Sequence, residues 1–488
     1  MDIIKRNKIT NLIAASFLIF VFIISLFSIK GDSLTMDEVA HLPAGYSYLT
    51  QKDMRLNPEH PPLLKDLAAL PLLFIENIKF QSEIQAWKED INSQWDFGFY
   101  FLYHTGNPAD KMIFWGRIPM ILLLILLGFF IFKWARELFG NKAGLLVLFL
   151  FSFSPTFLAH GRLITTDVGA ATGVVIATYY FLKALKLPTK KNIVLAGISF
   201  GIAELLKFSV ILLIPFFIFL GLIWWLVNPV RKSGLYPSQP SQWAGLSNGV
   251  KLGNFKQALK TLVLVFVIGF LLIWPVYQFH TWNYPAEKQL SDTKVYLKNT
   301  PEFIKKPLLW MSNKPIFRPY ALYLTGLSMV FHRVAGGNTT YFLGEVSNLG
   351  WRNYFPVIYA IKEPLAFHIL ILIALLYLAC LVRRSFSGGG ATKDRITNWL
   401  KSHFSEFSML TFIGIYWAVS ITGNLNIGIR HLLPVFPFTI LLVSAATISW
   451  LKEPYIKLKY FILFLLILWQ SVSVISIYPH FLSYFNEL

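Results

Sequence analysis

The chain of 488 residues contains almost no cysteine and little charge. Its single cysteine, Cys380, has no second thiol to pair with, so no internal disulfide can stabilise a loop. Charged residues make up 14% of the sequence, well below the roughly 25% that is usual for a soluble domain. Acidic residues are the scarcest, with 25 Asp and Glu against 44 Lys and Arg. These shortages exclude an ordinary soluble globule and leave a net charge of +19 to explain.

Hydrophobic residues are correspondingly abundant in the sequence. They account for 55% of the sequence, and aromatic residues for 16%. Apolar runs of about 20 residues, the length that spans a bilayer as a helix, recur along the chain. We therefore predict an all-α polytopic membrane protein with about eleven transmembrane helices. The predicted helices are residues 9–29, 112–132, 143–160, 168–186, 192–206, 209–228, 258–279, 356–382, 408–423, 432–450 and 458–477.

Basic residues occupy every second loop between these helices. Cytoplasmic loops of membrane proteins retain Lys and Arg, so this alternation places the N-terminus in the cytoplasm of a multi-pass cell-membrane protein. It also explains much of the positive charge without a nucleic-acid partner. The basic loop residues are Lys133, Arg136, Lys142, Lys183, Lys186, Lys190, Lys191, Arg231, Lys232, Lys251, Lys256, Arg383, Arg384, Lys393, Arg395, Lys401, Lys452, Lys457 and Lys459.

Two long loops lie on the opposite, outer side of the predicted topology. They are residues 31–111, between the first and second helices, and residues 280–355, between the seventh and eighth. We expect short juxtamembrane helices within both loops. The remaining transmembrane helices lie in residues 356–488, and residues 1–488 are predicted to form a single transmembrane domain.

The first outer loop begins with the sequence Thr35-Met-Asp37-Glu38. Thr35 and Glu38 have the spacing of a capping box, which would make them a helix start and nothing more. That interpretation leaves Asp37 unexplained. A carboxylate at the outer membrane surface is well placed to accept a proton from a hydroxyl nucleophile. We take Asp37 as the candidate general base and Glu38 as the candidate catalytic residue beside it.

A second polar segment of the same loop reads Asn57-Pro-Glu-His-Pro-Pro-Leu-Leu-Lys65. Its prolines fix backbone angles and force the preceding residues into an extended geometry, which holds Glu59 and His60 in place. The alternative is a proline-rich helix start with ordinary polar caps.

Four side chains of the first outer loop are of types that bind metals: Glu38, His41, Glu59 and His60. Their positions in the sequence do not match a recognised spacing of metal ligands. We therefore predict no metal and no other cofactor.

These two motifs resemble the family 39 glycosyltransferases, which comprise the protein O-mannosyltransferases and the bacterial aminoarabinose transferases and have the GT-C membrane fold. The Asp37-Glu38 pair after the first helix carries the resemblance, together with the later Pro-Pro motif. His60-Pro-Pro-Leu-Leu-Lys65 resembles the His-Pro-Pro-x-x-Lys of the mannosyltransferases. Glu59-x-Pro-Pro resembles the Glu-Lys-Pro-Pro of the aminoarabinose enzymes, with His60 where their Lys stands. The donor sugar is therefore left open, as are the acceptor class and the length of the carrier.

Further similarities extend over nearly the whole chain. The segment from Arg162 to Asp167 resembles the second acidic site of the fold, and Leu206-Lys207-Phe-Ser resembles its lysine-bearing turn. The resemblance makes Glu59, Asp167, Arg162 and His41 candidates for substrate binding or for that second acidic site. Asp167 could instead be a helix-start charge favoured by the helix dipole.

Three C-terminal segments resemble uncharacterised bacterial relatives. They are residues 341–345, residues 354–364, which end in Lys362-Glu-Pro364, and Asn426-Ile-Gly-Ile-Arg430-His-Leu-Leu-Pro434. Relatives with a segment like residues 478–488 commonly continue into a further outer region, so we expect this chain to be shorter than they are.

The resemblance implies transfer of a sugar from a polyprenyl-phosphate carrier to a hydroxyl of a protein, lipid or envelope glycan on the outer face, with inversion at the anomeric carbon. Asp37, a carboxylate with an ordinary pKa of about 3.9, would accept the proton only as the new bond forms. The departing phosphate would need cations, and the candidates are Lys207, Arg430 and His60. Alternatively, Lys207 could reach the aqueous phase from within the membrane, and Arg430 could be an interfacial anchor.

Two other function classes compete with an enzyme. A transporter would keep its ionisable site near the bilayer midplane and often shows internal repeats. Here the polar residues gather on one side, two long outer loops intervene, and we find no repeat. A catalytically inactive binding or assembly subunit would not need the intact Asp37-Glu38 pair. The sequence therefore favours an integral membrane glycosyltransferase.

Overall fold

The computed structural model describes residues 3–227, 248–386 and 392–488. Two of the predicted cytoplasmic basic residues, Arg231 and Lys232, lie outside the described residues. The side chains of Lys251, Arg384 and Lys393, at the ends of described helices, also lie outside the description.

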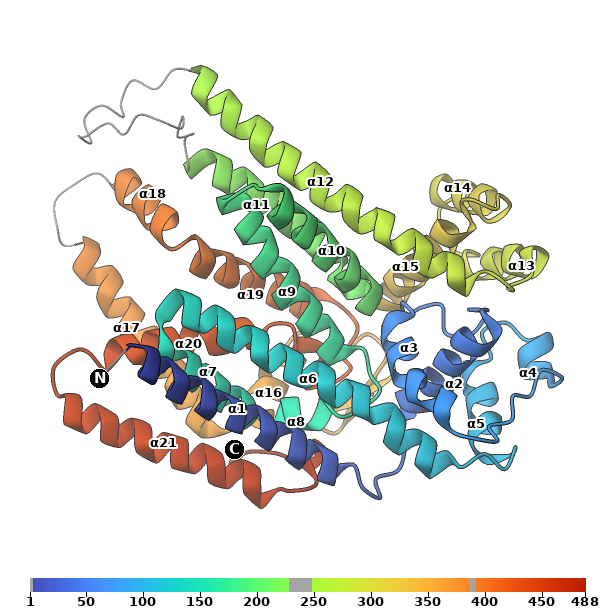
Figure 1. The fold of residues 1–488 in the computed structure, drawn as a ribbon, viewed down its shortest axis with the longest axis horizontal. Helices are drawn as coiled ribbons and strands as arrows, with labels where there is room; N and C mark the ends of the chain where they lie inside the picture. Colours follow the sequence, from blue (N-terminus) through green and yellow to red (C-terminus); the bar gives the residue numbers. More distant parts are fainter. Residues whose placement is uncertain (1–2, 228–247, 387–391) are drawn as a thin grey trace.

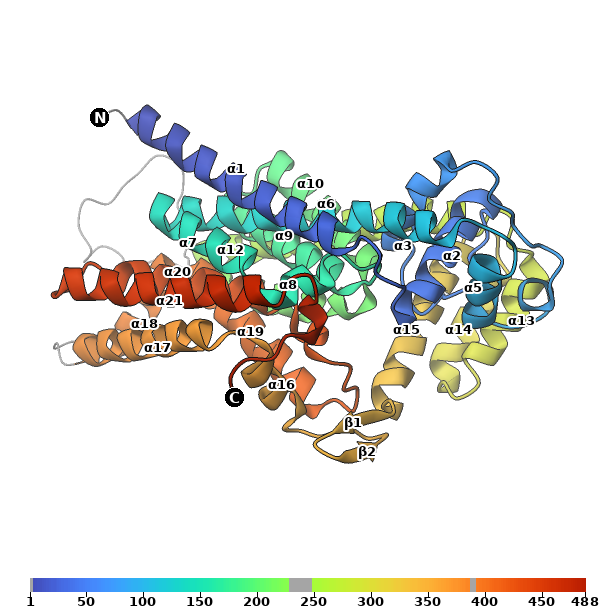
Figure 2. The ribbon, with the colours of Figure 1, turned by 90° about the horizontal axis from the view of Figure 1, so that it is seen from below.

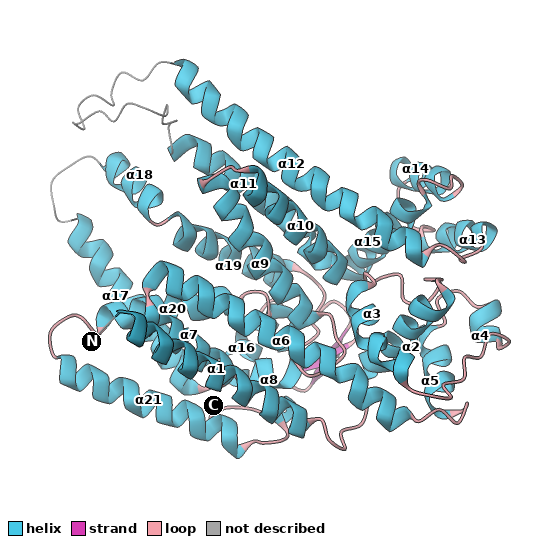
Figure 3. Cartoon of the chain, in the orientation of Figure 1, coloured by secondary structure: helices cyan, strands magenta, loops and turns pink. Residues whose placement is uncertain are grey.

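The chain is almost entirely helical, and its long helices run side by side along the longest axis of the molecule (Figures 1 and 3). Within the described residues, eight helical segments are long and apolar enough to cross a membrane, which confirms a multi-pass membrane protein. The predicted number of about eleven spans is not confirmed. The eight segments lie in α1 (Ile3–Ser28), α6 (Ala109–Phe139), α9 (Asp167–Lys186), η2 with α11 (Phe208–Leu212 and Leu213–Val227), α12 (Asn248–His280), α17 (Leu365–Phe386), α19 (Phe404–Thr422) and α21 (Ile456–Ser476).

Three further helices complete the bundle. Two are short and apolar, α7 (Asn141–Ser152) and α20 (Phe436–Trp450). The third, α10 (Lys190–Leu206), packs against α9 and α12. Large apolar side chains such as Leu122, Phe129 and Leu271 remain exposed on the long helices. In a membrane protein such surfaces face lipid.

Two helices that we predicted as continuous are broken, and both breaks coincide with a proline. The predicted helix 143–160 is divided into α7 and α8 (Pro155–His160), and the Ser154 side chain accepts a hydrogen bond from the Phe157 N–H to cap α8. The predicted helix 356–382 is divided into α16 (Tyr354–Lys362) and α17, with Pro364 between them. Proline favours helix starts and disfavours a helical residue before it, so the continuous predictions were wrong.

The first outer loop contains α2 (Met36–Gln51), α3 (Leu63–Ala69), η1 (Leu70–Phe74), α4 (Gln85–Lys88) and α5 (Gln94–Tyr103). The second contains α13 (Ala286–Tyr296), α14 (Glu302–Ser312) and α15 (Arg318–Gly336). Both sets of helices lie together at one end of the bundle (Figures 1 and 2). The core is divided in the same way, with one hydrophobic cluster inside the bundle and another where the first loop packs against α6, α12 and α15.

A small hairpin corrects the all-α prediction. Strands β1 (Thr340–Phe342) and β2 (Glu345–Ser347) pair antiparallel within the second loop. Leu343 and Gly344 between them both have positive φ, at 49° and 93°. A two-residue turn with both residues in the left-handed region matches the natural twist of paired strands. The turn therefore favours a hairpin even in a helical protein.

Candidate active site

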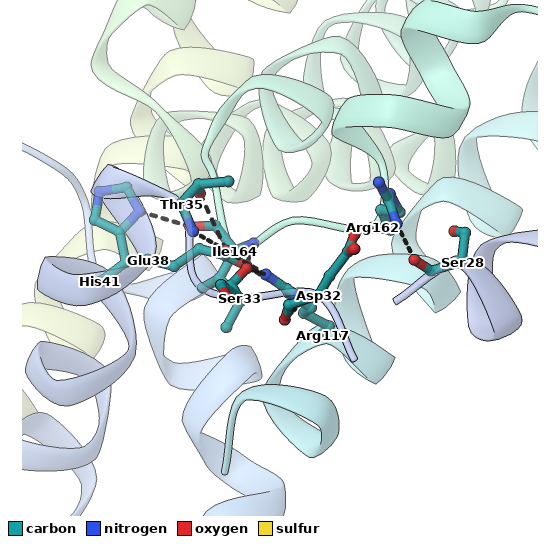
Figure 4. A network of polar contacts seen from close by, with 9 residues as sticks. All are labelled: Ser28, Asp32, Ser33, Thr35, Glu38, His41, Arg117, Arg162 and Ile164. Atoms are coloured by element: carbon teal, nitrogen blue, oxygen red, sulfur yellow. Dashed lines mark hydrogen bonds and ion pairs between the residues drawn. The ribbon is translucent and has the colours of Figure 1, made fainter. Parts of the chain in front are cut away.

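The side chain of Glu38 is sealed inside the protein at the start of α2. The predicted capping box is present, since the Thr35 N–H donates to Glu38 Oε2 at 2.8 Å. Arg117 of α6 forms a two-pronged ion pair with Glu38, with Nε–Oε1 at 2.8 Å and Nη2–Oε2 at 2.7 Å. The Ile164 N–H donates to Oε1 at 3.0 Å, and both ionic side chains are 0% exposed. We call this set the Glu38–Arg117 clamp (Figure 4).

The clamp joins three separate segments of the chain. Arg117 also donates to the carbonyl oxygens of Asp32 and Ser33, so it holds the chain that leads from α1 into α2. Burial alone would raise the pKa of Glu38, but the Arg117 guanidinium and the backbone donors hold it below its usual value. These contacts are those of the capping alternative, and a catalytic role for Glu38 stays a prediction.

Asp37, the residue directly before Glu38, pairs with a different cation. It forms an ion pair with Arg430, and the two side chains remain 29% and 26% exposed. Arg430 lies in the short 3-10 helix η4 (Ile429–Leu432), directly after Gly428. Gly428 has a φ of 88°, which only glycine adopts without strain, so it allows the chain to turn into η4. The fold thus brings Asp37, the candidate base, into direct contact with Arg430, a candidate phosphate-binding residue.

Two more of the predicted residues extend this pair into a row of alternating charge. Lys207, in extended conformation between α10 and η2, donates to Asp167 at the first position of α9, with Nζ–Oδ1 at 2.5 Å. Burial alone would lower the pKa of Arg430, but the carboxylates of Asp167 and Asp37 more than offset this and raise it. We call Lys207, Asp167, Arg430 and Asp37 the charge row. Its members come from four distant segments of the chain.

Three other predicted residues, His41, His60 and Arg162, contact groups outside the charge row. The His41 ring nitrogen Nδ1 is 2.8 Å from the Ile164 carbonyl oxygen, and the His41 and His60 rings meet edge to face at 5.1 Å. Burial lowers the pKa of both rings, most strongly for His60, so neither is a stable cation at neutral pH. Arg162 binds Asp32 at 2.7 Å and the Ser28 carbonyl, which ties its loop to the end of α1 (Figure 4).

Glu59 and Lys65 hold the proline-rich segment in place. The Glu59 carboxylate accepts hydrogen bonds from Asn92 at 3.1 Å and from Gln94 at 2.6 Å, both within the first outer loop. Lys65 is 1% exposed, and its three ammonium N–H groups are shared among four oxygens, each 2.8 Å from Nζ: the Tyr48 hydroxyl, the carbonyl and side-chain oxygens of Asn57, and the His60 carbonyl. Burial lowers the pKa of Lys65 to about 7.

A cavity of about 360 Å³ opens beside the charge row. This is within the size range of small-molecule sites. Its charged lining residues are Arg430 and Lys362, and no described residue of the lining is Asp or Glu. Burial lowers the pKa of the His160 ring, also in the lining, to about 4, so that ring is neutral. The remaining lining residues are Thr35, Pro155, Thr156, Ala159, Leu163, Thr165, Tyr354, Ile358, Ile427, Gly428, Ile429, Phe481, Leu482 and Tyr484.

Sequence reasoning missed three residues of this region. Arg117 lies within a predicted apolar span, where an arginine signals a buried partner. His160 is the last residue of α8, and Lys362 is the last residue of α16, next to a helix break that we did not predict. Within the described residues, no three His, Cys, Asp or Glu side chains are grouped so that they could hold a metal ion.

Comparison with known proteins supports the predicted resemblance. Residues 109–237 match the family model described as dolichyl-phosphate-mannose-protein mannosyltransferase, which confirms the resemblance over that stretch. No curated protein matches the chain.

Solved structures also show similarity. One is the oligosaccharyltransferase of Archaeoglobus fulgidus in complex with Zn and sulfate, at 14% identity and a TM-score of 0.48, covering 93% of this chain and 53% of that chain. The chain thus spans about half the length of the archaeal protein. ArnT from Cupriavidus metallidurans in the apo state has 13% identity and a TM-score of 0.34, covering 95% and 79%. ArnT bound to undecaprenyl phosphate has 12% identity and a TM-score of 0.33, covering 90% and 78%.

Proposed function

We propose that this chain is an integral membrane glycosyltransferase of the GT-C type, which transfers a sugar from a polyprenyl-phosphate-linked donor to an acceptor hydroxyl. The observation that carries the proposal is a cavity of about 360 Å³ lined by Lys362 and by Arg430, the ion-pair partner of Asp37, with no carboxylate among the described lining residues. A phosphate-bearing donor suits such a lining, and a partly exposed carboxylate beside it suits a proton acceptor. The family match of residues 109–237 supports both the activity and the class of donor.

The reaction on the outer face is a single displacement. The acceptor hydroxyl oxygen attacks the anomeric carbon, and the bond between that carbon and the phosphate oxygen breaks with its electron pair. The acceptor proton passes to the Asp37 carboxylate as the new bond forms, and the polyprenyl phosphate leaves. Attack from the face opposite the phosphate inverts the anomeric carbon.

Arg430 has two successive partners in this scheme. In the free enzyme it neutralises Asp37. A donor phosphate that enters the cavity competes for the same guanidinium, and its binding draws Arg430 away from Asp37. Loss of the ion pair frees the Asp37 carboxylate oxygen to accept the proton of the acceptor hydroxyl when the donor is in place. Lys207, which is held at 2.5 Å by Asp167, supports the charge row and leaves Arg430 to meet the phosphate.

The outer-face location is supported by the position of the site in the bundle. The charge row lies where α1 leads into α2 and where α9 begins, at the end opposite the predicted cytoplasmic loops. A transporter is disfavoured because the charges lie at one end of the bundle and not at its middle. A binding subunit is disfavoured because Asp37 is partly exposed beside a cavity.

Transfer of radiolabelled sugar tests the proposal. Purified protein in lipid nanodiscs is supplied with a panel of polyprenyl-phosphate sugars and with membrane extracts as acceptor. We expect Asp37→Asn to lower the transfer rate by about 100-fold or more, because general base catalysis contributes roughly 10²–10⁴-fold. Asp110→Asn, an exposed carboxylate of the same loop, serves as the matched control and should transfer at the normal rate.

Two results would contradict the proposal in different ways. Equal transfer by the wild-type protein and Asp37→Asn would remove Asp37 from the mechanism. Absence of transfer from every donor, with folded protein and intact carrier, would reject the glycosyltransferase assignment.

A further inference from the structure

The two cations of the cavity differ in their partners. Arg430 is paired with Asp37, but within the described part of the chain the structure gives Lys362 no acidic partner. The Lys362 ammonium donates to the Leu482 carbonyl oxygen at 3.2 Å and lies 3.5 Å from the centre of the Phe485 ring. Burial lowers its pKa to about 8. A partly buried ammonium with neutral partners has an unmet preference for an anion.

The fold holds Lys362 firmly in this position. It is the last residue of α16, and helix ends leave carbonyl oxygens without a partner inside the helix. Asn486 satisfies three such oxygens, because its side chain donates to the carbonyls of residues 360 and 363 at 2.5 and 2.7 Å and its N–H donates to residue 361 at 2.9 Å. The segment of residues 481–486 is thereby fixed to the end of α16, where the Lys362 side chain contacts Leu482 and Phe485.

The groups around Lys362 do not neutralise it. Burial raises the pKa of its neighbour Glu363 to about 8, although hydroxyl groups of Thr156 and Ser154 counteract the rise, so this carboxyl is mostly protonated at neutral pH. The His160 ring is affected by the positive charges of both Arg430 and Lys362. Both cations therefore act on one and the same part of the cavity.

We propose that Lys362 is a phosphate-binding residue, which holds the phosphate of the lipid carrier together with Arg430. The inference rests on the proposed function and deepens it by assigning the two phosphate ligands. Lys362 comes from the end of α16 and Arg430 from η4, and both line the same cavity as His160. Arg430 is paired with Asp37 in the free protein, so Lys362 is the lining cation to which the described residues give no acidic partner. Lys207 and His60, the other candidates from the sequence, do not line the cavity.

Binding measurements on the full-length protein in nanodiscs test this assignment. The probes are undecaprenyl phosphate, undecaprenol without phosphate, and inorganic phosphate. We expect Lys362→Gln to weaken binding of undecaprenyl phosphate about tenfold or more, because a charged hydrogen bond to phosphate is lost. Lys362→Arg keeps the charge and should stay within about threefold of the wild-type affinity. Lys298→Gln, an exposed lysine of the second outer loop, is the matched control and should leave binding unchanged.

Undecaprenol separates a phosphate contact from a packing contact. Equal binding of undecaprenol by wild-type protein and Lys362→Gln, together with weaker binding of undecaprenyl phosphate by the variant, supports the proposal. If Lys362→Gln weakens binding of undecaprenol as much as binding of undecaprenyl phosphate, the proposal is overturned. Lys362 would then act only through its packing against Phe485.

The remaining outcomes also decide the proposal. If Lys362→Gln binds undecaprenyl phosphate like the wild type, Lys362 is not a phosphate ligand, but the proposed function stands. If inorganic phosphate binds as tightly as the carrier with the same dependence on Lys362, the site serves free anions and the carrier assignment is wrong. If the wild-type protein does not bind undecaprenyl phosphate, the donor class of the proposed function fails as well.

Thermal unfolding of Lys362→Gln, compared with that of Lys362→Arg, shows whether weak binding is caused by loss of the fold.

Discussion

Asp37 and Glu38 are neighbouring carboxylates, each paired with an arginine, yet their environments are opposite. The Glu38–Arg117 pair is 0% exposed, and both carboxylate oxygens are occupied by Arg117 and backbone donors. The Asp37–Arg430 pair is 29% and 26% exposed and lies beside a cavity. A sealed pair can only hold segments together. A partly exposed pair can exchange one partner for a substrate.

The contrast also explains why the two positions are adjacent. Successive residues at the start of a helix point about 100° apart, so the Glu38 side chain can turn into the protein while the Asp37 side chain points elsewhere and meets Arg430. The clamp fixes the first turn of α2, and Asp37 is positioned as a consequence. In the proposed function, the buried carboxylate of Glu38 thus orients the candidate base directly before it in the sequence.

Removal of the sealed carboxylate should have the largest effect. Glu38→Gln leaves the Arg117 charge buried without its partner, and we expect a loss of about 3–5 kcal/mol in the free energy of unfolding. Thermal unfolding in detergent measures the loss. Glu89→Gln, at an exposed site of the same loop, should change the stability by no more than about 0.5 kcal/mol. An unchanged melting temperature for Glu38→Gln would mean that the clamp is not a structural requirement.

Removal of the exchangeable arginine should affect binding more than folding. We expect Arg430→Met to weaken binding of undecaprenyl phosphate about 10- to 100-fold, because a charge-assisted contact to phosphate is lost. Its melting temperature should stay close to that of the wild type. Lys207→Met is the informative companion, since it leaves the nearly buried Asp167 unpaired and should lower the melting temperature instead. A large loss of stability in Arg430→Met would make the Asp37–Arg430 pair a second clamp.

A rise in pH should change the charge of groups at the cavity and thereby weaken phosphate binding there. With a pKa of about 8, Lys362 is charged at pH 7 and mostly neutral at pH 9.5, while Glu363, also with a pKa of about 8, gains negative charge over the same range. Both changes disfavour a bound phosphate. We therefore expect the affinity for undecaprenyl phosphate to fall about tenfold between pH 7 and 9.5.

Other ionisable groups of the cavity stay in one form over this range. The pKa of His160 is about 4, that of Tyr484 is raised to about 12, and those of Tyr354 and Arg430 are also raised. In Lys362→Arg, only the smaller contribution of Glu363 should remain. An equal fall in the wild type and in Lys362→Arg would show that Lys362 does not cause the pH dependence.

The smallest effect should be on the stability of Asp37→Asn. A partly exposed ion pair contributes little, so we expect the free energy of unfolding to change by no more than about 1 kcal/mol. The comparison with Glu38→Gln in the same unfolding assay is direct, because the two changes are at adjacent residues and each replaces a carboxylate with an amide. Similar losses in both variants would contradict the distinction between a sealed and an exchangeable pair.

The sequence predicted the bundle well because lipid-spanning helices leave a strong local signal. Each predicted span has a helical counterpart, but the two spans that contain Pro155 and Pro364 are broken. In both places the continuous apolar run outweighed the proline in our prediction. The break at Pro364 places Lys362 at a helix end, so for this lining residue the error in local structure and the missed site residue have a common cause.

The charge row could be predicted only in part. The resemblance to family 39 glycosyltransferases singled out its four members, yet it did not indicate which cation pairs with which carboxylate. Asp37 and Arg430 are 393 residues apart, and Lys207 and Asp167 are 40 apart. Pairing at such separations depends on how helices pack, which no local pattern records. Arg117 was foreseeable in principle, because an arginine inside an apolar span requires a partner.

The two carboxylate pairs also differ in when they can form during synthesis. Glu38 and Arg117 are 79 residues apart, so the clamp can assemble once the first two membrane helices have left the ribosome. Asp37 can form its ion pair only after Arg430, 393 positions later, has been synthesised. Translation at about 5–20 residues per second separates these events by tens of seconds. An unfinished chain therefore has α2 already anchored while its aspartate still has no cation, and the acidic motif takes its final environment only when residue 430 has been inserted.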